Sequence, residues 1–180
     1  MALTPRLDSL EAIFRKLERE FVRAFHHANL THKADHFYNF CITAHSVRDY
    51  FLERLGKIKP TDAQPFNDAW SKIPVLVTVA DVANTAKHFQ LRNNNRSPRS
   101  ARTKHVRHGK TTMAEVYIND RGELIVKKKT GAPTYVIEVE GGEKFELYAF
   151  MNEVMNHWKQ QLKSHGIRTR RQSLAQLHGS

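Results

Sequence analysis

Residues 3–25 read LTPRLDSLEAIFRKLEREFVRAF, and their apolar side chains recur at steps of three and four residues. This spacing predicts an amphipathic helix that packs along a partner helix. Thr4 is the expected N-cap, Pro5 suits the first helical position, and the helix should end near Ala28 and Asn29. The apolar seam consists of Leu3, Leu7, Leu10, Phe14, Leu17, Phe21 and Phe25.

Two further helices are predicted before residue 92. The first runs from a cap at Thr31 to a stop at Gly56, and the short connection makes it antiparallel to the helix at 3–25. Residues 57–72 contain two prolines and are expected to form a loop, with one turn around Phe66–Trp70. Pro74 then opens a helix within residues 73–91, IPVLVTVADVANTAKHFQL.

The pattern changes after residue 91. Residues 92–110 lack hydrophobic periodicity and are expected to form a basic loop. The runs MAEVYI, ELIVKK and TYVIEVE alternate with NDRG and TGAP, which predicts a three-stranded antiparallel meander over residues 111–142. Residues 143–166 return to helical spacing, and residues 167–180 form a basic tail. The predicted class is α+β, mainly α: an antiparallel bundle of three helices in residues 1–91, completed by the C-terminal helix, with the meander inserted.

The net charge of +11 is concentrated in two short segments. Residues 92–110 contain seven Lys and Arg and no Asp or Glu, and residues 164–180 add three Arg, so the rest of the chain is nearly neutral. This distribution favours a polyanionic partner. The single Cys41 excludes an internal disulfide, and no long apolar run or apolar leader is present. We therefore expect a cytoplasmic protein without a membrane segment.

The helix at 73–91 carries a polar stripe. Asp81, Asn84 and His88 lie three and four residues apart, on one face of an otherwise apolar helix. If the helix that ends at Gly56 and the helix at 73–91 are neighbours, His45 and Arg48 of the first face this stripe. His88 would then act as acid or base, and Arg48 would neutralise a phosphate that Asn84, Asp81 and His45 help to surround. The alternatives are a structural Asp81–Arg48 salt bridge and a solvated face with an exposed Arg–Asp pair.

The basic loop and tail are the predicted nucleic-acid contacts. The loop lacks aromatic residues for base stacking, so we expect salt-dependent binding that tolerates many sequences. The alternatives are a solvated linker and an acidic protein surface as partner. Lys127, Lys128 and Lys129 fit better as edge-strand lysines that discourage sheet aggregation. The predicted contact residues are Arg92, Arg96, Arg99, Arg102, Lys104, Arg107, Lys110, Arg168, Arg170 and Arg171.

Four histidines cluster where the first two helices are connected. His32 and His36 are separated by one helical turn, a spacing that can bind Zn²⁺, and His26 and His27 precede them. A third ligand at a defined spacing is missing. We therefore predict a solvated, polar hairpin tip, and no metal or cofactor.

The run Ala83–His88, ANTAKH, resembles the motif of the HEPN superfamily, in which Arg is followed by a polar residue and then by His. Asn84 and His88 match an RN-x-x-x-H version of that motif, whereas Ala83 stands where the family has Arg. The resemblance covers residues 3–91 and the helix at 145–165. It implies a helical bundle that holds RNA or a nucleotide, and in many members a dimeric, metal-independent ribonuclease of toxin–antitoxin or phage-defence systems.

Three hypotheses follow. The first is an RNA-binding, HEPN-like protein that cleaves RNA without metal, with Arg48 replacing the missing Arg. The second, which Ala83 favours, is a non-catalytic accessory or regulatory subunit of a phage or mobile-element system. The third is a structural protein that oligomerises through the seam at residues 3–25.

Overall fold

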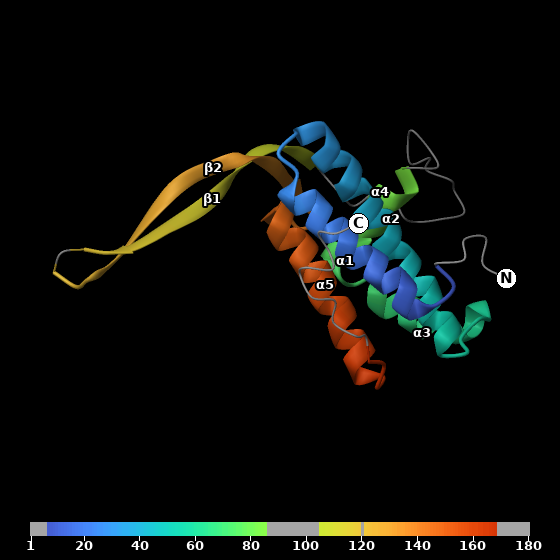
Figure 1. Cartoon of the computed structure of the whole chain (residues 1–180). Coiled ribbons are helices and arrows are strands. Elements are labelled where there is room, and N and C mark those ends of the chain that lie inside the picture. Colours follow the sequence, from blue (N-terminus) through green and yellow to red (C-terminus); the bar gives the residue numbers. More distant parts are fainter. Residues whose placement is uncertain (1–6, 86–104, 120, 169–180) are drawn as a thin grey trace.

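The computed structural model describes residues 7–85, 105–119 and 121–168. It confirms the predicted class, because helices dominate and the strands form a three-stranded antiparallel sheet (Figure 1). No helix in these ranges is long and apolar enough to cross a membrane. The elements in chain order are α1 Leu10–His26, α2 Leu30–Arg54, α3 Pro60–Trp70, α4 Pro74–Thr85, β1 His105–Ile118, β2 Leu124–Glu138, β3 Lys144–Glu146 and α5 Leu147–Ser164.

Helix α1 begins later than predicted. Ser9 caps it by accepting a hydrogen bond from the Ala12 backbone N–H at 3.2 Å, whereas Leu7 precedes the helix. The predicted cap at Thr4 is therefore wrong, because the Ser9 hydroxyl satisfies an N–H of the first helical turn; Thr4 and Pro5 themselves lie outside the described residues. The middle of the apolar seam packs inside the bundle, where the side chains of Leu10, Phe14 and Leu17 are buried.

Helix α2 runs antiparallel to α1 and packs against it, as predicted. Asn29, rather than Thr31, is the N-cap, since its side chain accepts from the N–H groups of Thr31 and His32 at 2.8 and 3.3 Å. The helix ends at Arg54, and Gly56 adopts the left-handed conformation (φ +69°) that suits a glycine after a helix.

Helix α3 corrects the predicted loop at residues 57–72. Pro60 lies in its first turn, a position that favours proline, and Pro65 lies inside the helix. An internal proline loses one backbone hydrogen bond. Burial compensates for that loss: Trp70 is 3% exposed and its ring centroid lies 5.1 Å from that of Trp158 in α5.

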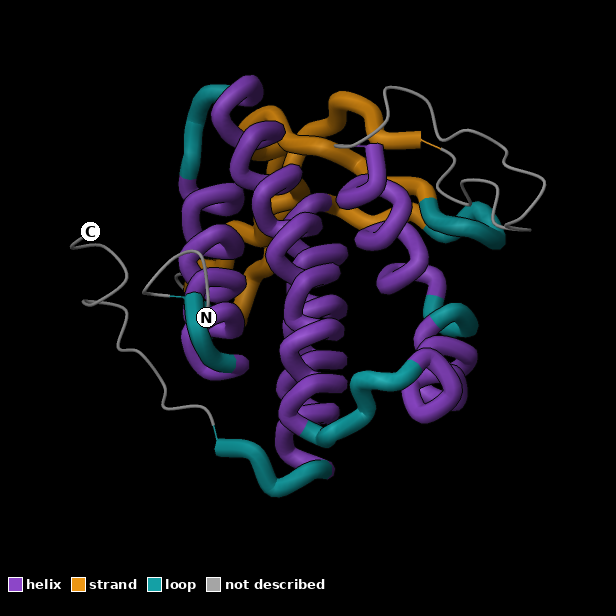
Figure 2. Tube along the Cα trace, turned by 90° about the vertical axis from the view of Figure 1, so that its right-hand side faces the viewer, coloured by secondary structure: helices purple, strands orange, loops and turns teal. Residues whose placement is uncertain are grey.

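Helices α4 and α5 complete the body. Pro74 opens α4 as predicted, and α4 packs against α2 and α5. The helix predicted within residues 143–166 is confirmed as α5, and its Phe150, Met151, Val154 and Trp158 side chains are fully buried. Figure 2 shows the helices side by side, with the strands lying toward one end of them.

The sheet has the order β1-β2-β3, but its strands are not those predicted. Residues 105–110 belong to β1 and pair with residues 133–138, so the basic loop cannot extend to residue 110. The expected turn TGAP lies inside β2 as an irregularity, where Lys110 pairs with Pro133 and Thr112 with Thr130. One extra residue in β2 is accommodated by a bulge, a place where Gly and Pro are tolerated.

Strands β1 and β2 therefore form one long hairpin, which we call the ribbon (residues 105–138). Its 14-residue first strand corresponds to about 45 Å of extended chain. Among the described residues its base is anchored to the helices: Thr134 and Ile137 are buried, and the Tyr135 hydroxyl donates to the Leu30 carbonyl at 3.0 Å. The rest of the ribbon extends away from the helices (Figure 1).

Candidate nucleic-acid interface and polar helix faces

The polar stripe of α4 lies on a helix that packs against α2. Asp81 and Asn84 are half-buried, and so are His45 and Arg48 on α2. The helices are thus neighbours, which is the condition that the predicted composite site requires. His88 lies outside the described residues, so the distance from Arg48 to His88 stays a prediction.

Arg48 pairs with its neighbour on α2. Its Nε and Nη2 groups donate to Asp49 Oδ1 at 3.1 and 3.0 Å, which is the Arg–Asp pair expected for a solvated helix face. The same two residues line a cleft of about 460 Å³ between α2 and α3, together with Glu53, Lys57 and Asn67. The cleft presents both signs of charge, and so does not favour an anionic ligand over a cationic one.

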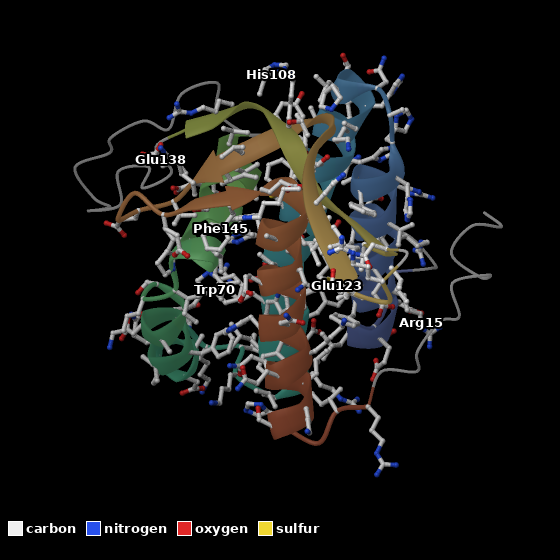
Figure 3. The ribbon with its side chains drawn as sticks, turned by 90° about the vertical axis from the view of Figure 1, so that its left-hand side faces the viewer. Arg15, Trp70, His108, Glu123, Glu138 and Phe145 are labelled. Carbon is white, nitrogen blue, oxygen red and sulfur yellow. The ribbon has the colours of Figure 1, made fainter. Side chains whose placement is uncertain are left out.

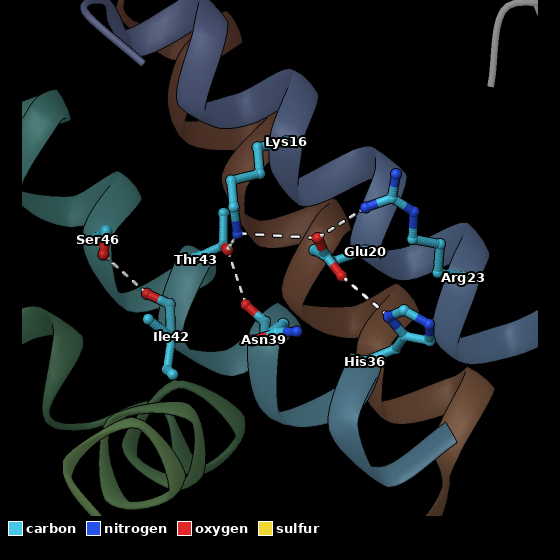
Figure 4. Close-up of polar contacts among 8 residues, drawn as sticks. All are labelled: Lys16, Glu20, Arg23, His36, Asn39, Ile42, Thr43 and Ser46. Atoms are coloured by element: carbon cyan, nitrogen blue, oxygen red, sulfur yellow. Dashed lines mark hydrogen bonds and ion pairs between the residues drawn. The ribbon is translucent and has the colours of Figure 1, made fainter. Parts of the chain in front are cut away.

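Glu20 is the centre of a charged network that the sequence-based interpretation missed (Figure 4). Its carboxylate is buried between α1 and α2, and lies 3.2 Å from Arg23 Nη1, 3.9 Å from Lys16 Nζ and 3.4 Å from His36 Nδ1. The Lys16 ammonium also donates to the Thr43 hydroxyl. Burial lowers the pKa of Lys16, and the Glu20 carboxylate partly opposes that shift.

The network joins two helices through a buried carboxylate, so we interpret it as structural. Two of its contacts were readable in the sequence, because Lys16 and Arg23 lie four and three residues from Glu20 on one helix. The contact with His36 was not, since it depends on how α2 folds back.

The histidine cluster lies at the connection of α1 and α2, as predicted. The ring centroid of His27 lies 4.7 Å from that of His32 and 5.7 Å from that of His36. Within residues 7–85, 105–119 and 121–168, no three His, Cys, Asp or Glu side chains are placed to hold a metal ion.

The ribbon carries exposed cations on both strands. Figure 3 labels His108, Glu123 and Glu138 on the ribbon. Near its base, Arg107 donates to Glu138 at 2.9 Å. Further along, Lys110, Lys127 and Lys128 are exposed. Of the predicted nucleic-acid contacts, Arg107 and Lys110 lie on the ribbon and Arg168 is exposed after α5, so the described ones do not form one patch. The other predicted contacts, Arg92 to Lys104 with Arg170 and Arg171, lie outside the described residues.

The distal half of the ribbon also exposes aliphatic side chains. Val116 and Ile118 on β1 are 55% and 68% exposed, and their partners Val126 and Leu124 on β2 are 57% and 67% exposed. The sequence contains a signal for this exposure, because both strands carry aliphatic residues two positions apart here. The sequence predicted a three-stranded meander over residues 111–142, and this exposure was not identified from it.

Comparisons with protein-family models, with curated proteins and with solved structures found no match to this chain.

Proposed function

We propose that this protein binds nucleic acid, and that the ribbon makes the contact. The observation that carries this proposal is a two-stranded antiparallel ribbon that leaves the helical body and exposes Lys110, Lys127 and Lys128 along its length. A two-stranded ribbon has the width that the major groove of B-form DNA admits. Lysine side chains along such a ribbon reach phosphates on the groove walls.

The ribbon also has the properties of an element that a binding partner stabilises. A two-stranded hairpin is marginally stable in water on its own. β1 is an edge strand, and β3 pairs only with residues 136–138 of β2, so the outer edges of the distal ribbon are open among the described residues. A polyanion that contacts the lysines would stabilise this element on binding.

A charge-matched pair of variants tests the proposal. Lys110→Gln/Lys127→Gln/Lys128→Gln removes three ribbon cations, and Lys59→Gln/Lys72→Gln/Lys163→Gln removes three exposed cations from the helical body. Binding to labelled duplex is measured by fluorescence anisotropy over a series of salt concentrations. We expect the ribbon variant to reduce the slope of log K against log salt by about 2.7, at roughly 0.9 for each lost phosphate contact.

The body variant should keep the wild-type slope. Equal losses in the two variants would show that affinity follows net charge alone, and no loss in the ribbon variant would place the contact elsewhere. Either result contradicts the proposal.

We propose metal-independent RNA cleavage as a second candidate function. The partial HEPN-like motif supports it, and so does the packing of α4, which carries Asp81 and Asn84, against α2, which carries His45 and Arg48. The test compares the wild type with His88→Ala on labelled RNA in EDTA, with His32→Ala, an exposed histidine outside the ribbon, as the control. Cleavage that depends on His88 supports the candidate, whereas equal cleavage or no cleavage in all three proteins removes it.

A further inference from the structure

We infer that the ribbon binds duplex DNA by pressing an aliphatic patch against a base step and partly unstacking it. This inference rests on the proposed function and assigns its substrate class. The patch consists of Val116, Ile118, Leu124 and Val126.

The four side chains form one continuous surface. Val116 pairs with Val126 and Ile118 with Leu124, and residues directly opposite each other on paired strands share a face. Residues 116 and 118, like residues 124 and 126, are two positions apart and so share that face as well. Each of the four is more than half exposed, so the surface is available to a partner.

The patch lies on the flank of the ribbon rather than at its tip. The tip is a polar turn in which Asn119 Oδ1 accepts from the N–H groups of Arg121 and Glu123 at 3.0 and 2.9 Å. A membrane-inserting hairpin would have to bury this turn before its aliphatic residues. A partner that lies alongside the ribbon, as a nucleic-acid groove does, meets the patch first.

Charge around the patch favours a polyanion over a second copy of the chain. Lys128 pairs with Ala114 on the same face, directly beyond Val126, and Arg121 lies in the turn. Glu123, which precedes Leu124, accepts a hydrogen bond from Asn119 Nδ2 at 2.8 Å. Two copies stacked through this face with their ribbons parallel would bring their Lys128 ammonium groups together, whereas a phosphate backbone would neutralise them.

A nucleic acid combines both features, because its phosphates are anionic and its stacked bases present apolar surfaces. Proteins that insert aliphatic wedges between base steps bend the duplex, and they favour pyrimidine–purine steps because these unstack easily. Such wedges enter duplex DNA from its minor groove, and strands of DNA-binding proteins are found in either groove. We therefore assign duplex DNA with a flexible step as the ligand.

The test uses a short duplex with one central TA step, 2-aminopurine beside that step and a fluorophore pair at its ends. Val116→Thr/Ile118→Thr makes the patch polar while keeping β-branched side chains that suit a strand. Val106→Thr/Ile58→Thr makes the same two changes at exposed positions outside the patch. Far-UV circular dichroism and thermal melting establish that both variants are folded.

The wild type should raise 2-aminopurine fluorescence, bring the duplex ends closer and prefer the TA duplex to an A-tract by roughly tenfold. The Val116→Thr/Ile118→Thr variant should lose these three effects and keep the salt slope, and the control should retain all of them. Wild-type binding without unstacking or TA preference overturns this inference and leaves the proposed function standing.

Two further results distinguish failure of this inference from failure of the proposed function. Binding to neither DNA nor RNA at low salt overturns both the inference and the proposed function. The second result is association of the wild type with vesicles of anionic phospholipid, abolished by Val116→Thr/Ile118→Thr, together with no unstacking of the duplex. This result assigns the patch to membranes and overturns the inference.

Discussion

Glu20 shows how a single buried charge connects two helices. Its side chain is 6% exposed, while those of Lys16 and Arg23 are 29% and 42% exposed, so the carboxylate is desolvated and its partners are partly hydrated. Such a pair contributes little net free energy relative to an apolar pair, but the loss of one member leaves the other charge without compensation. The geometry of the α1–α2 hairpin therefore depends on Glu20 more than on any one of its partners.

Glu20→Gln should lower the free energy of unfolding by about 2 kcal/mol, because Lys16 and His36 would then meet a neutral amide in a buried position. Chemical denaturation measures the change. Glu153→Gln on the exposed side of α5 removes the same charge and should stay within about 0.5 kcal/mol of the wild type. Equal effects at the two positions would contradict a structural role for the network.

His157 should make stability depend on pH. Burial lowers the pKa of its imidazole from 6.5, and its ring lies 6.1 Å from Trp70 and 6.0 Å from Trp158. The unfolded chain therefore takes up a proton at higher pH than the folded protein does, and stability falls as pH drops from 6.5 through the lowered pKa.

His157→Gln should flatten that part of the profile of unfolding free energy against pH. The same substitution at exposed His108 is the control. If wild type and His157→Gln lose stability in parallel between neutral pH and pH 5, the imidazole does not contribute.

At the scale of elements, periodicity predicted most of the helices and failed where local signals competed with tertiary structure. The seam at 3–25 and the apolar face of α5 were readable because each helix buries one side. Helix α3 was missed because two prolines argue for a loop, and only the burial of Trp70 against α5 overrides them. The bulge at TGAP was read as a turn because Gly and Pro favour both structures.

Gly109 lies where β1 approaches β2 closely, near the base of the ribbon. A Cβ atom at Gly109 would lie 2.5 Å from Val136 Cγ2, and the β-branched valine side chain has little freedom to move away. Gly109→Ala should therefore destabilise the protein by about 1 kcal/mol, and adding Val136→Ala should relieve the clash. Thermal melting of the two single variants and the double variant measures the coupling; strictly additive effects would contradict close packing here.

At the scale of the whole molecule, the described residues form a helical body and a projecting arm, the ribbon. The core is built from the helices together with Ile137 and Val139, and no side chain of the distal ribbon belongs to it among the described residues. The residues of the candidate interface were present in the sequence, but their gathering on one projecting element was not predictable. It required two strands to pair over their full length instead of three strands forming a compact meander.

Replacing residues 113–129 by Asn-Gly, a two-residue hairpin turn between Thr112 and Thr130, should leave the body folded. We expect the melting temperature to change by only a few degrees, because the deleted part buries no core residue. Binding to duplex DNA should be lost in the same protein. A shortened protein that melts much earlier would show that the body needs the arm, and full retention of binding would exclude the distal ribbon as the contact.

The register of the ribbon constrains how its reach can vary. His105 and Glu138 are paired at the base, so the chain leaves and re-enters the body at adjacent points. Adding one residue to each strand lengthens the arm by about 3.4 Å and turns the outermost pair to the opposite face, whereas adding two restores the original face. A change of arm length that keeps the exposed face therefore requires matched steps of two residues per strand.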